Sequence, residues 1–212
     1  MKKSIFVATA SVFTFVAVAS SQAQQPVTKT KDTSAVNQKS VQDTTTKTSS
    51  QAKIVGGAQM LPSSNFIENA SQSKEHTTLI TAIEKAGLTD SLKAEGPFTV
   101  FAPTNDAFSK LPAGTLDTLT KADNKEKLAD VLSYHIVPGK LTSRDLALAV
   151  ARANGNATLT TVEGDNLTVS INAEKNLQIT DEKGNIALVT MFDVEQSNGI
   201  VHVINNVLLP KE

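Results

Sequence analysis

The sequence has no cysteine, no tryptophan and a single tyrosine. Without cysteine it can form no disulfide, thiolate metal site or thiol nucleophile, and it cannot carry a lipid attached to an N-terminal cysteine. Exported domains depend on disulfides mainly when their core is small. A domain of about 150 residues buries enough apolar surface to fold without them.

Excess charge of either sign is also lacking, because 20 Lys and Arg residues stand against 21 Asp and Glu residues. No basic cluster is present, and proteins that grip nucleic acid need one to neutralise phosphates. A polybasic segment for an anionic membrane surface is missing for the same reason. The composition therefore excludes nucleic acid as a partner.

The N-terminus resembles a secretory signal peptide, residues 1–23. Lys2 and Lys3 precede an apolar run, Ile5–Ala19, and Ser21 and Ala23 are the small residues that a signal peptidase reads. The run is shorter than the ~20 residues that span a bilayer. We expect cleavage after Ala23, a mature chain without a membrane span, and a periplasmic or secreted location.

Residues 24–53 are rich in Thr, Ser, Gln and Lys and contain no aromatic residue. Such a segment cannot bury enough apolar surface to offset the entropy of ordering it. We expect a disordered linker here and one folded domain over residues 54–212.

Helical patterns dominate the first part of that domain. Thr78–Ala86 has apolar residues at helical spacing and is followed by Gly87, a typical residue just past a helix end. Lys125–Leu132 predicts a second helix, and Thr142 with Asp145 resembles a capping box that opens a third.

Strand patterns dominate the second part, with two earlier strands expected at Phe98–Ala102 and Tyr134–Val137. After Asn154 the apolar period changes to two, between turns rich in Gly, Asn and Asp. The later strands are expected at Thr158–Val162, Leu167–Ile171, Leu177–Thr180, Ile186–Phe192 and Ile200–Leu209. Helices first and strands later indicate the α+β class, with the last strand in a central position.

Catalytic and metal-binding patterns are weak. Ile54–Gly57 imitates the activated N-terminus of a trypsin-like protease, but no matching nucleophile loop follows. Of the three histidines, His76 lies among polar residues and is expected to be solvated. His135 and His202 have apolar neighbours and are expected to be hydrogen-bonded core residues, with metal or haem ligation as the alternative. No catalytic residue and no metal site are assigned.

Thr104, Asn105 and Asp106 follow an expected strand and open an expected short helix. Their side chains can satisfy free backbone N–H groups at such a junction, with Thr104 as the N-cap. The alternative is that Asn105 and Asp106 line a ligand cleft. We also expect His135 to hold its strand to this Thr104–Asp106 loop.

Three sequence blocks resemble the signature of the fasciclin (FAS1) family, in the family's order. They are TVFAPTNDAF (Thr99–Phe108), SYHIVPGK (Ser133–Lys140) and NGIVHVINNVLLP (Asn198–Pro210). The resemblance is to bacterial, single-domain, secreted members and spans Ile54 to Leu209. It implies a twisted β-wedge of about seven strands flanked by several helices.

The resemblance also implies a function: a non-enzymatic extracytoplasmic interaction domain in cell adhesion or in extracellular matrix and biofilm contact. In animal members, integrin binding involves the Tyr-His block and an Asp-Ile pair, which correspond here to Tyr134, His135, Asp193 and Val194. The implied partner is an extracellular protein or polysaccharide, and no cofactor is implied. The alternatives are a small-molecule or haem-binding module near His135 and, last, an enzyme.

Overall fold

The computed structural model describes residues 52–94 and 96–211. The expected signal peptide and almost all of the expected linker lie outside the described residues, so cleavage after Ala23 stays a prediction. Within the described ranges, no helix has the length and apolar character needed to cross a membrane.

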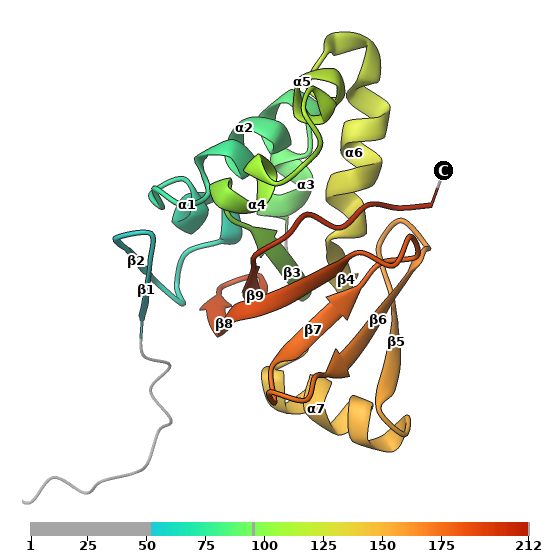
Figure 1. The fold of residues 1–212 in the computed structure, drawn as a ribbon. Coiled ribbons are helices and arrows are strands. Elements are labelled where there is room, and N and C mark those ends of the chain that lie inside the picture. The colour runs from blue at the N-terminus through green and yellow to red at the C-terminus, as the bar shows by residue number, and fades with distance from the viewer. Residues whose placement is uncertain (1–51, 95, 212) are drawn as a thin grey trace, which may run out of the picture. The chain divides into compact units, whose positions relative to one another are not determined.

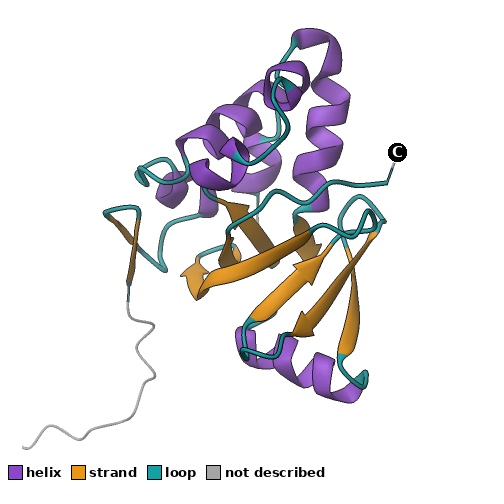
Figure 2. Ribbon diagram, viewed as in Figure 1, coloured by secondary structure: helices purple, strands orange, loops and turns teal. Residues whose placement is uncertain are grey.

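A seven-stranded sheet in the order β4-β3-β9-β8-β7-β6-β5 organises the described residues (Figure 1, Figure 2). Its strands are β3 (Phe98–Pro103), β4 (Ile136–Pro138), β5 (Asn156–Thr160), β6 (Asn166–Ile171), β7 (Leu177–Thr180), β8 (Ile186–Gln196) and β9 (Gly199–Ile204). β3 and β9 run parallel, and the other neighbouring pairs are antiparallel. The antiparallel run from β5 to β9 is the meander that the period-two pattern predicts.

The sheet curls until its two edges touch. The backbone N–H of Val162, just after β5, donates to the carbonyl of Ile136 in β4 at 2.8 Å. β9 lies between β3 and β8 and is buried at every position, which confirms the central placement expected for the last strand. The curl gives the β5–β8 part of the sheet an inner face that packs and an outer face that meets solvent.

Helices gather at both ends of the sheet (Figure 1). They are α1 (Phe66–Ala70), α2 (Thr77–Ala86), α3 (Thr89–Lys93), α4 (Asn105–Ser109), α5 (Thr115–Leu119), α6 (Lys125–Tyr134) and α7 (Ser143–Arg152), with a 3-10 turn η1 (Ala122–Asn124). The first six lie on the side of β3 and β4, whereas α7 contacts β5 and β6. Mixed helices and one large sheet confirm the α+β class.

Local signals set several helix ends where the sequence predicts them. Gly87 follows α2 in the left-handed conformation, with φ of 76°, and Thr142 and Asp145 form a capping box at α7. The strand expected at Tyr134–Val137 is wrong at its first two residues. α6 continues through Tyr134, and His135 is its C-cap, because its N–H donates to the Leu132 carbonyl.

A small hairpin that the strand pattern did not predict precedes α1. It pairs β1 (Lys53–Val55) with β2 (Ala58–Met60) across a Gly56-Gly57 turn, in which both glycines have positive φ. A Cβ on Gly56 would lie 2.4 Å from the Ser73 hydroxyl, so only glycine fits. The protease-like Ile54–Gly57 stretch is thus part of a structural turn.

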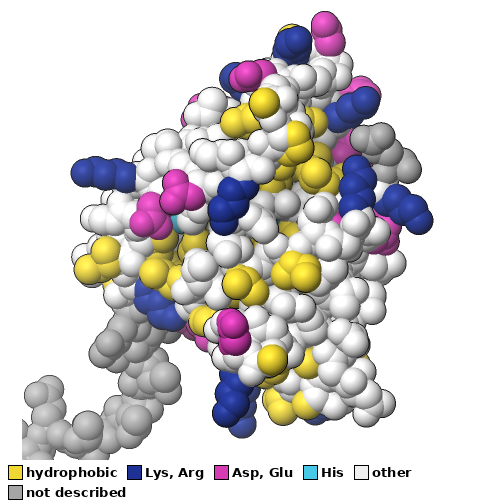
Figure 3. Space-filling view, in the orientation of Figure 1, with side chains coloured by type: hydrophobic (Ala, Val, Ile, Leu, Met, Phe, Trp, Pro, Cys, Tyr) yellow, Lys and Arg dark blue, Asp and Glu magenta, His cyan; other side chains and the backbone are white. Residues whose placement is uncertain are grey.

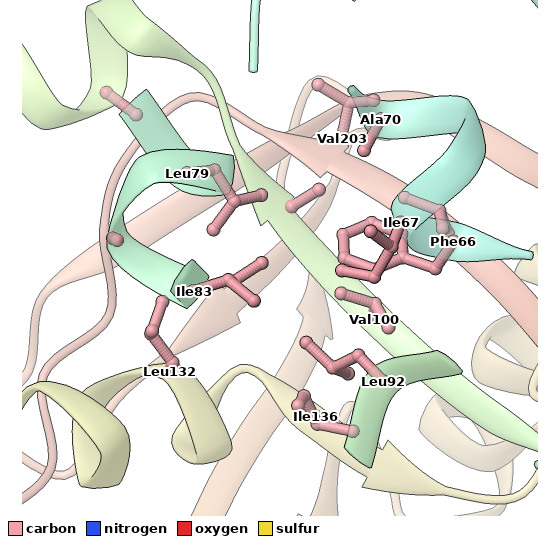
Figure 4. Packing of buried hydrophobic residues seen from close by; sticks show 14 of the residues in the cluster. Phe66, Ile67, Ala70, Leu79, Ile83, Leu92, Val100, Leu132, Ile136 and Val203 are labelled. Carbon is pink, nitrogen blue, oxygen red and sulfur yellow. The ribbon is translucent and has the colours of Figure 1, made fainter. Parts of the chain in front are cut away.

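Two apolar cores lie on opposite sides of β3 and β9. The helix-side core joins the hairpin, the helices and the sheet (Figure 4), and its labelled members are Phe66, Ile67, Ala70, Leu79, Ile83, Leu92, Val100, Leu132, Ile136 and Val203. The second core fills the curl of the sheet with Phe101, Tyr134, Leu146, Leu167, Val169, Ile179, Ile204 and Leu208 among others. The signature blocks supply residues to both cores.

Candidate functional site

Tyr134 lies at the end of α6 and is fully buried. Its hydroxyl donates to the Asn166 carbonyl at 2.8 Å and accepts from the Glu182 backbone N–H at 3.2 Å. Burial is the main cause that raises the pKa of Tyr134 to about 12. The hydrogen bond from the Glu182 N–H lowers this pKa, and the nearby carboxylates of Asp181, Glu182 and Asp165 raise it slightly. The side chain therefore joins α6 to the start of β6 and to the turn after β7.

His135 is the next residue and is also buried. Nδ1 lies 2.7 Å from the Val131 carbonyl, and Nε2 accepts from the Leu208 backbone N–H at 3.0 Å. These partners assign a neutral ring with its proton on Nδ1. Burial lowers the pKa of His135 to about 4, against smaller contributions from Val131 and Asp181 that raise it.

The expected link from His135 to the Thr104–Asp106 loop is wrong. The imidazole holds the segment after β9, because Leu208 and not that loop lies beside Nε2. The backbone carbonyl of His135 accepts a hydrogen bond from the N–H of Phe101 in β3. The expectation that His135 is a buried, hydrogen-bonded core residue is consistent with these contacts.

His202, in β9, has both ring nitrogens occupied as well. Nε2 lies 2.9 Å from the Leu141 carbonyl, and Nδ1 accepts a long 3.4 Å bond from the Asp193 N–H. The ring stacks on Phe101 with 5.8 Å between centroids. Burial is the largest cause that lowers the pKa of His202; Lys53 lowers it further, whereas Leu141 and Asp193 oppose this.

Asp193 joins β8 to the start of α7. It has a positive φ of 53° at a point where β8 shifts register against β9. One carboxylate oxygen accepts from the Ser143 N–H at 2.6 Å and the other from the Ser143 hydroxyl. Ser143 is the first residue of α7, so the carboxylate accepts from an otherwise unpaired helix N–H. Its negative charge also interacts favourably with the positive end of the helix dipole.

The four residues that the resemblance connects with binding do not form an open patch. Tyr134 and His135 are buried, and Val194 is 2% exposed in the helix-side core. Asp193 is half-buried and bonded to Ser143. A role of these side chains in binding stays a prediction, but Tyr134, His135 and Val194 would have to act by shaping the fold.

Thr104, Asn105 and Asp106 have separate roles. Thr104 is the N-cap of α4, as expected, and accepts from the Ala107 N–H. Asn105 reaches across to α2, where its Oδ1 accepts from the Thr78 N–H at 3.0 Å and its amide donates to the Lys74 carbonyl. Asp106 is exposed in the first turn of α4.

His76 contradicts the expectation of a solvated side chain, because it is only 3% exposed. Nδ1 lies 3.0 Å from the Ser73 hydroxyl, whereas Nε2 has no hydrogen-bond partner among the described residues. The ring borders an apolar cavity of about 20 Å³ beneath the hairpin, lined also by Val55 and Met60. Burial lowers the pKa of His76 to about 4, and the Ala102 carbonyl opposes this only in part.

Two larger hollows lie at the surface. One, of about 520 Å³, is where the loops before β3, after β4 and between β8 and β9 meet, with Lys93 and Lys140 beside Gly199. The other, of about 470 Å³, lies between α6 and the C-terminal segment, with Lys127 and Asp130 at its wall. In the described part of the chain, no group of three or more His, Asp or Glu residues is arranged to hold a metal ion.

Comparison with known proteins agrees with this architecture. The family model described as the fasciclin domain matches residues 74–210. Protein sll1483 of Synechocystis is 38% identical over 77% of this chain and 83% of its own, and the uncharacterized protein sll1735 of the same organism is 41% identical over 68% and 97%. Immunogenic protein MPB70 of Mycobacterium bovis is 34% identical over 66% of each chain.

A solved structure shows the same fold. The FAS1 domain pair from the insect cell adhesion molecule fasciclin I superposes with a TM-score of 0.61 and 22% identity, over 69% of this chain and 51% of the pair. This chain therefore spans about half of that structure. The three signature blocks, the curled seven-stranded sheet and the family-model match together place the chain in the fasciclin (FAS1) domain family.

Proposed function

We propose that this protein is an exported, non-enzymatic interaction domain that contributes to cell adhesion or to contact within an extracellular matrix. The observation that carries the proposal is its membership of the fasciclin family, together with the fold it shares with a domain pair from an insect cell adhesion molecule. Expected export through residues 1–23 would put the domain where such contacts form.

The hydrogen bonds of His135 and His202 argue against these two rings as general bases. A general base needs a free lone pair within reach of a substrate proton. In His135 and His202 that lone pair already accepts a backbone N–H, from Leu208 and Asp193 respectively. Both rings contribute to folding and have no free nitrogen to offer a substrate.

The same geometry argues against a haem module at His135. Ligation of iron through Nε2 would break the hydrogen bond with Leu208 and would need an open space beside a buried ring. We therefore expect protein purified from its native host to show no Soret band. A Soret band that disappears in a His135→Ala variant that still folds would favour the haem module.

A deletion strain tests adhesion directly. Strains lacking the protein, and strains complemented with the wild-type chain, are compared for surface attachment and biofilm cohesion. The proposal expects weaker cohesion without the protein and recovery on complementation. Unchanged cohesion would contradict it, and so would reproducible turnover of a glycoside, ester or peptide substrate by the pure protein.

A further inference from the structure

The outer face of the sheet over β5–β8 is a regular array of uncharged side chains. Successive residues of a strand alternate between the two faces, and the residues between the outward ones fill the second core. The outward positions are Asn156, Thr158 and Thr160 in β5, Asn166 and Thr168 in β6, Gln178 and Thr180 in β7, and Ile186, Leu188 and Thr190 in β8, whereas Ser170 in β6 is buried. We call this surface the threonine face.

Strand register places these side chains in rows. Thr158 pairs with Thr168, Thr168 with Thr180, and Thr180 with Ile186, so one row crosses all four strands. The next row runs from Asn156 through Ser170, which is buried, and Gln178 to Leu188. Neighbouring strands lie about 4.8 Å apart, and alternate residues of a strand about 6.7 Å apart, so the hydroxyl and amide groups repeat at short intervals.

Charged side chains are confined to the rim. None of the outward positions carries a charge, although solvent-facing surfaces usually have about 25–35% charged residues. The charges lie in the turns at the ends of the strands: Glu163 and Asp165, Glu174 and Lys175, and Glu182 and Lys183. Figure 3 shows the surface over β5, β6 and β7 as largely free of charged side chains. Acidic residues outnumber basic ones on this rim.

The composition of the threonine face limits its partners. Anionic membranes and nucleic acids need clustered Lys or Arg, which this face lacks. Protein interfaces depend on Trp, Tyr and Arg, with Ser and Thr under-represented among their hot spots. The acidic excess on the rim would repel an acidic polymer. None of these arguments excludes a neutral, hydroxyl-rich polymer as the partner.

We propose that the threonine face binds an uncharged polysaccharide, an inference that rests on the proposed function and gives it a surface and a ligand class. Thr hydroxyls and Asn and Gln amides both donate and accept, and so do sugar hydroxyls. Ile186 and Leu188 add apolar contact for the C–H faces of sugar rings. Without an aromatic ring to stack on a sugar, each contact is weak, and many domains on one polymer supply the total affinity.

The experiment is retention of the purified mature protein on insoluble polysaccharides. Cellulose, chitin and curdlan are the neutral supports, and calcium alginate and cross-linked polygalacturonate are the acidic ones. The proposal expects retention on at least one neutral support, no retention on the acidic ones, and little change between low and high salt, since no ion pair is involved. Retention on none of the neutral supports, or on acidic supports alone, would overturn it.

Paired variants locate the surface. Thr168→Lys with Thr180→Lys puts two charges at the centre of the threonine face, and retention should fall at least about tenfold because these charges lose water on binding. Thr81→Lys with Thr118→Lys changes the net charge equally at exposed positions of α2 and α5 and should leave retention unchanged. Thermal melts show that each variant is folded. Equal retention of both folded variants would overturn the proposal.

The two proposals fail in different ways. If cohesion is lost in the deletion strain but the pure protein does not bind neutral polysaccharides, the adhesion role is supported and the binding role of the threonine face is rejected. If the protein binds a neutral polysaccharide through this face but the deletion strain keeps full cohesion, the binding role of the face is supported and the adhesion role is rejected.

Discussion

The imidazole of His135 accepts a hydrogen bond from the backbone N–H of Leu208 at 3.0 Å, across 73 residues of chain. Leu208 is fully buried in the second core, and the same ring joins back to α6 through the Val131 carbonyl. One side chain thus links the end of α6 to the segment after the central strand β9. Tyr134 and His135, neighbours in the second signature block, together hold three distant parts of the chain.

Replacing His135 with Ala should destabilise the protein. It leaves the Leu208 N–H and the Val131 carbonyl buried without their partner, and an unsatisfied buried group costs about 1–3 kcal/mol. Urea denaturation at pH 7.5 measures the change in the free energy of unfolding. Ser109→Ala, which removes an exposed hydroxyl, is the control and should change stability little. Equal midpoints for the His135 variant and wild type would contradict this role.

Stability should fall as the pH drops from about 6.5 towards 4. His76 and His135 have folded-state pKa values of about 4, below the ordinary 6.5, so in this window the unfolded chain binds protons that the folded chain does not. Each such group can contribute a slope of up to about 1.4 kcal/mol per pH unit. The stability that neutral rings confer is complete above pH 6.5 and is lost on acidification. Urea midpoints at a series of pH values measure it.

A His76→Gln variant provides the matched test of that slope. Removing one of the histidines with a lowered pKa should make stability depend less steeply on pH between 6.5 and 4.5, above the range where most carboxylates titrate. An identical pH dependence for the variant and wild type would show that His76 does not bind a proton on unfolding in this window.

Signals within a few residues of each other predict local structure well in this chain. Thr104, Thr142 and Gly87 set helix ends where expected, because a cap depends only on its own turn. Alternating apolar residues likewise predict the strands after Asn154. The ordered fasciclin blocks add the topology, which short-range patterns do not contain.

Contacts between distant segments could not be predicted in this way. The neighbours of His76 are polar, so its local sequence suggests solvent, yet the β1–β2 hairpin and α1 cover it. The Gly56-Gly57 pair between two short alternating stretches is a hairpin signal that could have indicated this cover. The apolar residues around Tyr134 fit a helix or a strand equally, and the tertiary contacts of its hydroxyl favour the helix end.

Asp193→Ala should also lower stability. It removes the carboxylate that accepts from the Ser143 N–H at the start of α7, and loss of such a helix-end partner costs about 0.5–2 kcal/mol. Asp193→Asn keeps a carbonyl acceptor and a side chain that tolerates positive φ, so it should lose less. Thermal melts of both variants show which of them loses more stability. A larger loss for Asn than for Ala would contradict this role of Asp193.

Gly199→Ala should be among the most damaging substitutions in the sheet. A Cβ at this position would lie 2.0 Å from the Phe98 carbonyl oxygen, so the paired ends of β3 and β9 would have to separate. Gly184→Ala is the comparison: its Cβ would meet open space, and its cost comes only from a φ of 86°. Expression and melting temperature should be reduced far more by the first change. Similar melting temperatures would show that the sheet yields easily at Gly199.

The N-terminal hairpin and α1 should be indispensable, although the fasciclin family model matches only residues 74–210. Val55, Met60, Phe66, Ile67 and Ala70 all lie in the helix-side core. Burying one such large side chain contributes about 1.5–3 kcal/mol, and a whole domain is stable by only about 5–15 kcal/mol. A chain that starts at residue 74 should therefore lose its cooperative thermal transition. A chain that starts at residue 52 should have the same melting temperature as the full mature protein, because the sequence before residue 52 has few apolar residues that could pack on the domain. A normal melt of the shorter chain would show that the sheet and the remaining helices fold without this cover.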